Sequence, residues 1–428
     1  MLFRSQKLYD TFGYIGKSMK EEIEKNDIKK IFIELVGNDI NIIKNQVVSY
    51  ILGHYCFDDF KSGKGKNKDT GRITYFYHKN KKFNDAINNY IYEGNIQNEI
   101  RSLINTPANI LNSSEYTKYI KNNINKGIDK SSNKIKMKIL DETELKKIGC
   151  NLIVGVNKGS SNKPIMIVLE YKNGKGKGKE KGKGKEKDVV ALVGKGVMFD
   201  TGGYNIKGGD FSDMKNDMTG SAVVYALFKL LAKNNIPGHF VGILPLVENM
   251  VDANATRPGD ILKSYSGHTV EIVDTDAEGR LIMADALAYT KNYKPHLCID
   301  IATLTGQVSY IFNNESSVIM GNNNKYIQEM IKCGINNNEK LWELPMWKEY
   351  KDLTKSNIAD LRNYTNEASA GTIMAGAFLS NFVPDGANWI HLDIAGTDNL
   401  KNGSATRHYG ATGEILRSVF DFLQNLRK

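Results

Sequence analysis

Several polar side chains of the kinds that bind metal ions or stabilise an oxyanion lie close together in this 428-residue sequence, after an apolar run typical of a buried strand. Lys195 and Asp200 belong to GKGVMFDTGG, Lys207 belongs to NIKGG, and Asp217 belongs to DMKNDM. Glycines beside such residues let the backbone approach a ligand closely. The apolar period of residues 218–233 predicts a helix, and a carboxylate such as Asp217 is favoured at the start of a helix.

A second stretch, residues 274–281 (DTDAEGRL), follows another predicted strand and carries Asp276, Glu278 and Arg280. Alternate side chains of an extended backbone point to the same face. We therefore expect these three side chains to converge at a strand end. In open α/β sheets, ligands bind at the carboxyl ends of the strands.

The four carboxylates can each be interpreted singly as a helix cap or a turn residue. Gathered beside apolar strands, they would repel one another and raise their own pKa values unless cations neutralised them. Two divalent metal ions balance four negative charges if the adjacent lysine enters as a neutral amine. The sequence therefore predicts a two-metal hydrolytic site, whose residues are Lys195, Asp200, Asp217, Asp276 and Glu278.

The same blocks resemble those of the M17 leucyl aminopeptidases, also called cytosol aminopeptidases. DTDAEGRL is similar to the family signature, and GKGVMFDTGG, MKNDM, DIATLTG (300–306) and HLDIAG (391–396) are similar to further family blocks in the family's order. The resemblance implies removal of N-terminal residues from peptides by a metal-dependent exopeptidase. It also implies a homohexamer.

By this resemblance, two sets of residues hold two metal ions. Lys195, Asp200, Asp217 and Glu278 would hold one, and Asp200, Asp276 and Glu278 the other. Two carboxylates would then bridge the ions. Oxygen ligands with one amine fit zinc, which we expect, and leave manganese and cobalt open.

The resemblance also implies that Lys207 polarises the scissile carbonyl and that Arg280 holds a bicarbonate ion that relays protons. Met214, Thr303 and Gly306 match positions that line the pocket for the first side chain. A methionine wall suits Leu or Met. Ordinary packing at a strand end is the alternative for these three residues.

Three features depart from the family pattern. Asp274 stands where the family has Asn, and Ala370 stands where Gly is usual. The first adds a negative charge beside the predicted metals or the leaving-group pocket. The N-terminal domain is also shorter than the family's, which bears on the hexamer more than on the chemistry.

The chain is too long for one ordinary core, so we expect an α/β protein of two domains. A small N-terminal α/β domain (1–91) and a linker helix (92–112) should precede a catalytic domain (113–428) with a mainly parallel sheet flanked by helices. The predicted strands are 165–171, 189–193, 239–246, 270–274, 296–304 and 389–394, and the predicted helices include 218–233 and 281–292.

The net charge of +10 comes mostly from two Gly/Lys-rich segments, 61–72 and 173–188, which carry about +4 each. Such segments cannot bury apolar surface, and we expect solvated insertions. A nucleic-acid-binding protein is an alternative, although neither segment has the interleaved aromatics that base stacking needs. A different two-metal hydrolase, such as a phosphoesterase, is another, although histidine ligands would be expected there.

The four cysteines lack CxxC spacing, and the N-terminus lacks the apolar core of a secretory signal. No run approaches the roughly 18 apolar residues of a spanning helix. We therefore expect a cytoplasmic protein that binds no membrane, and the family resemblance implies that its partners are peptides.

Overall fold

The computed structural model of the chain describes residues 2–26, 28–62, 73–128, 134–174, 189–366 and 369–427. Most of the predicted insertion at 173–188 and of the basic segment at 61–72 lies outside these residues. Within them, no helix is both long and apolar enough to cross a lipid bilayer.

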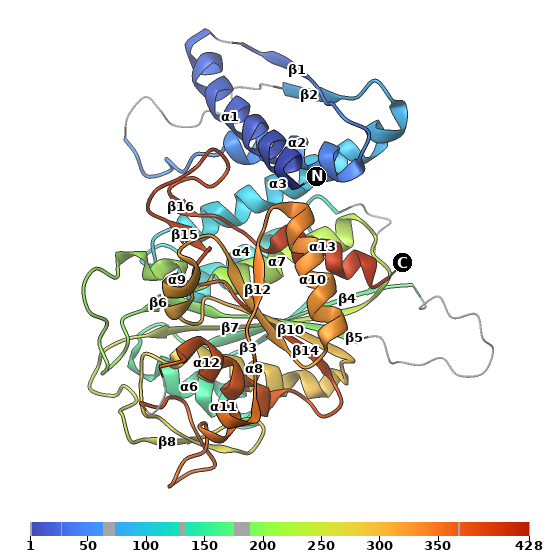
Figure 1. The fold of residues 1–428 in the computed structure, drawn as a ribbon. Helices are drawn as coiled ribbons and strands as arrows, with labels where there is room; N and C mark the ends of the chain where they lie inside the picture. The colour runs from blue at the N-terminus through green and yellow to red at the C-terminus, as the bar shows by residue number, and fades with distance from the viewer. Residues whose placement is uncertain are drawn as a thin grey trace, which may run out of the picture.

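A nine-stranded sheet forms the centre of the molecule (Figure 1). Its strands are β3 (Lys136–Leu140), β4 (Ile165–Asn173), β5 (Val189–Gly194), β6 (Gly196–Asp200), β7 (Gly238–Asn249), β10 (Leu297–Ala302), β11 (Ser317–Gly321), β12 (Leu341–Glu343) and β14 (Asn388–Asp393). Their order is β12-β11-β14-β10-β5-β7-β4-β3, and β6 extends beside β7.

The middle of this sheet, β14-β10-β5-β7, is parallel, whereas β3, β4 and β11 each pair antiparallel with a neighbour. The parallel strands β5 and β10 are buried along their whole length, which explains why their sequences are apolar apart from Asp300 of β10. The predicted mainly parallel sheet is confirmed.

Helices cover both faces of the sheet, as Figure 1 shows. One layer includes α4 (Ser113–Asn123), α7 (Thr219–Lys233), α10 (Asn324–Asn337) and α13 (Leu416–Asn425). The other includes α5 (Glu142–Ile148), α6 (Asn151–Val156), α8 (Glu278–Tyr289) and α12 (Gly371–Leu379). Two shorter helices, α9 (Gln307–Phe312) and α11 (Lys348–Asp352), follow β10 and β12.

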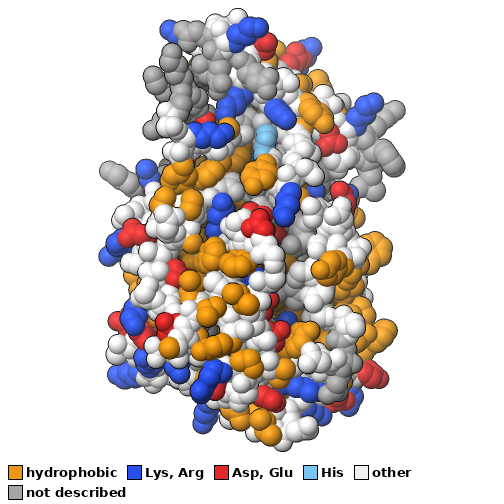
Figure 2. Space-filling model, turned by 90° about the vertical axis from the view of Figure 1, so that its left-hand side faces the viewer, with side chains coloured by type: hydrophobic (Ala, Val, Ile, Leu, Met, Phe, Trp, Pro, Cys, Tyr) orange, Lys and Arg blue, Asp and Glu red, His pale blue; other side chains and the backbone are white. Residues whose placement is uncertain are grey.

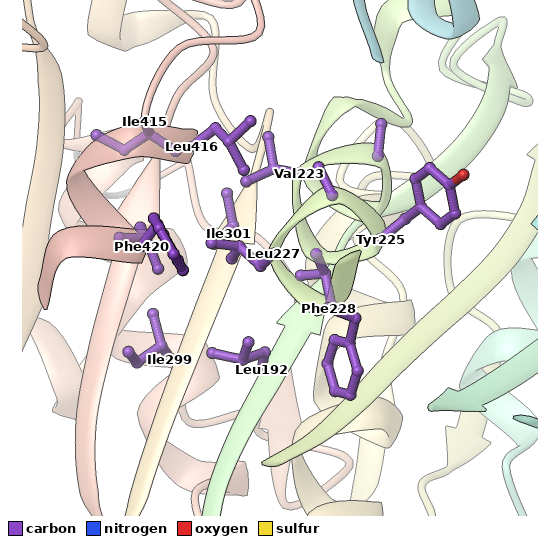
Figure 3. Close-up of a cluster of buried hydrophobic side chains, with 14 of the residues drawn as sticks. Leu192, Val223, Tyr225, Leu227, Phe228, Ile299, Ile301, Ile415, Leu416 and Phe420 are labelled. Carbon is purple, nitrogen blue, oxygen red and sulfur yellow. The ribbon is translucent and has the colours of Figure 1, made fainter. Parts of the chain in front are cut away.

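Helix α7 lies at the centre of the first layer. Figure 3 shows Val223 and Leu227 of this helix against Leu192 of β5, Ile301 of β10 and Phe420 of α13. All five side chains are buried, so the start of α7 is fixed against the ends of two central strands. That packing matters because Asp217 lies just before the helix.

The N-terminal elements stand at one end of the molecule (Figure 1). They are α1 (Leu2–Asn26), β1 (Lys30–Glu34), α2 (Ile40–Gly53), β2 (Ile73–Tyr77) and α3 (Asn84–Asn105), with β1 and β2 in a parallel pair. Helix α3 ends before the Thr-Pro pair, because proline disfavours helix in the residue before it. The domain boundaries at 91 and 112 stay predictions.

The predicted strand 270–274 is wrong as a member of the central sheet. Only Thr269–Glu271 is a strand, β9, and it belongs to a separate three-stranded sheet with β8 (Ile261–Lys263) and β13 (Leu361–Arg362). A turn contains Asp276, and Glu278 opens α8, so the expected extended backbone through Arg280 is also wrong. A remaining hairpin joins β15 (Asn399–Leu400) to β16 (Gly410–Ala411).

His408 links the hairpin between β15 and β16 to the N-terminal elements. Its Nε2 lies 3.1 Å from the carbonyl oxygens of both Leu52 and Gly53. Burial, with help from Arg101, lowers the pKa of this imidazole to about 4. The neutral ring therefore donates its Nε2–H to these carbonyls at neutral pH.

A group with a lowered folded-state pKa is protonated first in the unfolded chain, so stability is lost as pH falls from about 6.5 to about 4. Glutamine at this position keeps a hydrogen-bond donor but does not titrate. We therefore expect the free energy of unfolding of His408→Gln to fall by about 1–2 kcal/mol less than that of the wild type between pH 7 and pH 4.5, allowing for the partial exposure of the side chain. Urea unfolding of both proteins at pH 7 and pH 4.5 measures it. An equal loss in both would contradict the expectation.

Candidate metal and catalytic site

The site lies where the central strands end. Lys195 directly follows β5, Asp200 is the last residue of β6, and Thr303 directly follows β10. Asp217 lies between a short 3-10 helix (Ser212–Asn216) and α7. Glu278 comes from the opposite layer as the first residue of α8, so both helix layers and the sheet position the site.

Lys195 is the centre of one half of the site. Its Nζ lies 2.7 Å from Asp217 Oδ1 and 3.1 Å from Glu278 Oε1, and it donates to the carbonyl oxygen of Thr303 at 2.6 Å. The Thr303 hydroxyl donates to Asp217 Oδ1 at 2.8 Å. Gly279 is required beside this lysine, because a Cβ there would lie 2.5 Å from the Lys195 side chain.

Lys207 is the centre of the other half. Its Nζ lies 2.7 Å from Asp200 Oδ2 and 2.5 Å from Asp276 Oδ1. Asn249 donates from Nδ2 to Asp200 Oδ1 at 2.8 Å and to the carbonyl oxygen of Thr275 at 3.0 Å. This amide therefore ties the end of β6 to the turn that carries Asp276.

The three most buried carboxylates fit a metal ion. One oxygen each from Asp200, Asp217 and Glu278 lies within 4.8 Å of the others, and all three residues are buried. Among the described residues, Asp217 Oδ2 and Glu278 Oε2 are buried oxygens without a hydrogen-bond donor. Since a buried carboxylate oxygen without a partner is costly, the residues present suit a bound cation.

The electrostatics lead to the same conclusion. Burial, reinforced by Glu278, raises the pKa of Asp200 to about 7, and burial raises the pKa of Asp217 well above its usual range. Burial and Glu278 also raise the pKa of Asp276 to about 6. Burial is the largest cause of these shifts and the neighbouring carboxylates add to it, so a bound cation would favour the ionised forms of these groups.

Glu278 and Lys195 shift in the directions that favour their charged forms. Burial opposes ionisation of Glu278, but Lys195 and Lys207 outweigh it and lower its pKa. Burial opposes the charge on Lys195, yet Asp217 and Glu278 raise its pKa. The neutral Lys195 expected from the sequence is a property of a metal-loaded site and stays a prediction.

The other predicted residues surround this cluster. Arg280 is buried on α8, two residues after Glu278, and donates from Nη1 to the carbonyl oxygen of Asn363 at 2.8 Å. Met214 lies half-buried in the 3-10 helix before Asp217, and Gly306 is exposed at the start of α9. The structure thus brings the five predicted metal ligands, Lys207 and Thr303 together. Arg280, Met214 and Gly306 lie within three residues of Glu278, Asp217 and Thr303 along the chain.

Two asparagines that hold the site were missed from the sequence. Asn249 contacts Asp200, and Asn363 contacts the turn that carries Asp276. Asn249 is the last residue of β7 and lies three residues beyond the predicted strand 239–246, so its position near a carboxyl end was a usable signal. Asn363 follows β13, a strand of only two residues, Leu361–Arg362, which apolar periodicity does not reveal.

Comparison with known proteins identifies the class. Residues 98–420 match the catalytic-domain model of the cytosol aminopeptidase family, and the chain belongs to this family. A probable cytosol aminopeptidase of Hamiltonella defensa is 36% identical over 96% of this chain and 80% of its own length. One of Chlorobium phaeobacteroides is 37% identical over 96% of this chain and 78% of its own length.

A solved structure shows the same fold. It is the bottromycin maturation enzyme BotP in complex with Mn, with a TM-score of 0.85, 26% sequence identity, and coverage of 98% of this chain and 88% of that chain. The α/β fold predicted from the sequence is therefore confirmed. The family membership makes the chain an aminopeptidase, a hydrolase that depends on bound metal.

Proposed function

We propose that this aminopeptidase uses two divalent metal ions to remove N-terminal residues, with Leu or Met preferred. The observation that carries the proposal is the pair of buried oxygens without donors, Asp217 Oδ2 and Glu278 Oε2, within a cluster of carboxylates. Each half of the cluster has one lysine and two carboxylates, so the cluster holds four carboxylates and two lysines. The excess of negative charge suits bound cations.

The proposed ligand sets follow the two halves of the site. Lys195 and Asp217 belong to the half with Thr303, and Asp276 belongs to the half with Lys207. Asp200 and Glu278 are the proposed bridging carboxylates. Paired divalent ions polarise a carbonyl, lower the pKa of a bound water and bind a free α-amine.

Lys207 and Arg280 carry the remaining proposed chemistry. Lys207 is only part-buried and lies between Asp200 and Asp276, so its ammonium can donate to the scissile carbonyl and to the oxyanion that develops there. Arg280 would hold a bicarbonate ion that relays protons. In support, its Nε is buried, and the Nε–H has no hydrogen-bond acceptor among the described residues.

Apolar substrates suit the face around the site. Figure 2 shows the side of the molecule on which β6 and α9 lie in Figure 1, and hydrophobic side chains gather across its middle. Tyr204 and Ile206 after β6, and Tyr310 of α9, are exposed. Met214, Thr303 and Gly306 are the proposed pocket for the first side chain.

Zinc is the proposed metal, and manganese is the alternative that the Mn complex of BotP favours. The four carboxylate ligands suit either ion. A cytoplasmic location accords with the name of the family, and the homohexamer stays a prediction.

Comparison of a free and a blocked amino terminus tests the proposal. We expect leucyl-p-nitroanilide to be cleaved and N-acetylleucyl-p-nitroanilide to be cleaved at least about 1,000-fold more slowly, because an acylated nitrogen is a poor metal ligand. The measurement is kcat/KM for each substrate with the metal-loaded protein. Equal cleavage of both would refute the exopeptidase assignment.

A further inference from the structure

Asn363 binds the turn that carries Asp276 with every polar atom of its side chain. Its Oδ1 accepts from the backbone N–H of Val273 at 2.8 Å and of Asp274 at 3.3 Å. Its Nδ2 donates to the carbonyl oxygen of Asp274 at 2.6 Å and of Ala277 at 3.3 Å. Four hydrogen bonds from one buried carboxamide therefore fix a segment that has no regular secondary structure.

The backbone of Asn363 extends this contact in two directions. Its N–H donates to the carbonyl oxygen of Glu271 at 3.1 Å, which continues the parallel pairing of β13 with β9. Its carbonyl oxygen accepts from Arg280 Nη1 at 2.8 Å. One residue thus contacts the segment before Asp276, the segment after it, and the buried guanidinium of α8.

The contacts require a carboxamide of this length. The turn presents two N–H groups and two carbonyl oxygens to the side chain, and among the side chains of this size only asparagine has both an acceptor and a two-proton donor. An aspartate would be isosteric, yet it would place a carboxylate oxygen against the carbonyl oxygens of Asp274 and Ala277. That repulsion would push the turn away from its present position.

We propose that Asn363 is a positioning residue that sets the metal affinity of the site by holding Asp276 and that orients Arg280 through its own carbonyl oxygen. The inference rests on the proposed metal site. Asp276 is fixed on its other side by Lys207 and through Asp274 Oδ1, which accepts from the Asp276 N–H at 2.8 Å. Asp274 is itself held by Asn363, so loss of the carboxamide frees Asp274 and, with it, the contact that Asp274 makes to the Asp276 N–H.

The test compares Asn363→Asp and Asn363→Ala with Asn337→Ala, using the full-length chain. Asn337 is a suitable control because it is equally buried, at 1% exposure, and donates to the Cys333 carbonyl and to Asp421. Calorimetric titration of the metal-free proteins with MnCl₂ is the first readout. Outer-shell partners of metal ligands typically contribute about 10–100-fold in affinity.

We expect both Asn363 variants to bind at least one Mn²⁺ equivalent about 10-fold or more weakly than the wild type, whereas Asn337→Ala binds as the wild type does. Their kcat should fall, and excess Mn²⁺ should recover part of it. Circular dichroism checks that each variant is folded. If Asn363→Asp is unfolded, the comparison rests on Asn363→Ala.

Unchanged Mn²⁺ affinity and kcat in a folded Asn363 variant would overturn the inference and leave the proposed function standing. The same holds if Asn337→Ala weakens Mn²⁺ binding as much as the Asn363 variants do, because the effect would then be general destabilisation. Failure of the wild type to bind Mn²⁺ would refute the proposed metal site itself. The wild-type titration therefore separates the two failures.

Discussion

Asp217→Ala should lose tightly bound metal and lower kcat/KM by at least about 1,000-fold, or about 4 kcal/mol of transition-state stabilisation. The substitution removes the carboxylate that lies 2.7 Å from Lys195 and accepts from the Thr303 hydroxyl. It also removes Asp217 Oδ2, a buried oxygen that has no hydrogen-bond donor among the described residues. Metal content after dialysis, measured by mass spectrometry, and kcat/KM on leucyl-p-nitroanilide test it.

Asp213→Ala is the matched control, because Asp213 lies in the same 3-10 helix but is part-exposed and outside the contact network of the site. This variant should keep both metal and rate. If Asp217→Ala retains its full metal content, Asp217 is not a ligand, and the division of the site into two halves is wrong.

Lys207→Ala should show the opposite pattern, with metal retained and kcat lowered about 100- to 1,000-fold, the usual effect of removing one oxyanion donor. Lys207 pairs with Asp200 and Asp276, so its ammonium competes with a metal ion for both carboxylates. The variant should therefore bind metal at least as tightly as the wild type. Its KM for leucyl-p-nitroanilide should change much less than kcat.

Lys215→Ala serves as the control for removal of a nearby lysine, since Lys215 lies in the 3-10 helix before Asp217 and has no ion pair among the described residues. We expect wild-type kinetics from it. Loss of metal from Lys207→Ala, or an unchanged kcat, would contradict the assigned role.

The fold could be predicted where burial is uniform. β5 and β10 are buried along their whole length, so their sequences, VVALVG and LCIDIA, are apolar except for Asp300 and could be identified as strands without knowledge of their partners. The run at 270–274 (VEIVD) is also predicted as a strand of the central sheet, but only its first two residues are in a strand, β9, which belongs to a small sheet that contacts α6 through β8. Sequence alone does not separate these cases, because pairing partners are set by tertiary contacts.

The site could be predicted as a set of residues but not as a geometry. A carboxylate beside glycines at a strand end pointed to Asp200, and one at a helix start pointed to Asp217; the structure groups both with Glu278, and Lys195 pairs with Asp217 and Glu278. The carbonyl oxygen of Thr303 could not be predicted, because a backbone acceptor leaves no mark on the sequence. Asn363 could not be predicted because its contacts come from a turn far away in the chain.

Asp274 has a role in the structure that the sequence comparison did not suggest. Its Oδ1 accepts from the backbone N–H of Asp276, a turn contact that an asparagine oxygen could also make. Its charge contributes to the raised pKa of Asp276. The substitution therefore preserves the turn and adds a negative charge beside one half of the site.

Removal and return of metal test the central claim most directly. The wild type is treated with a chelator, freed of it by dialysis, and titrated with Zn²⁺ or Mn²⁺ while kcat/KM on leucyl-p-nitroanilide is followed. The proposed site predicts loss of nearly all activity and its return as the second equivalent of metal binds. Full activity in the metal-free protein, or full recovery with a single equivalent, would contradict a two-metal site built on Lys195, Asp200, Asp217, Asp276 and Glu278.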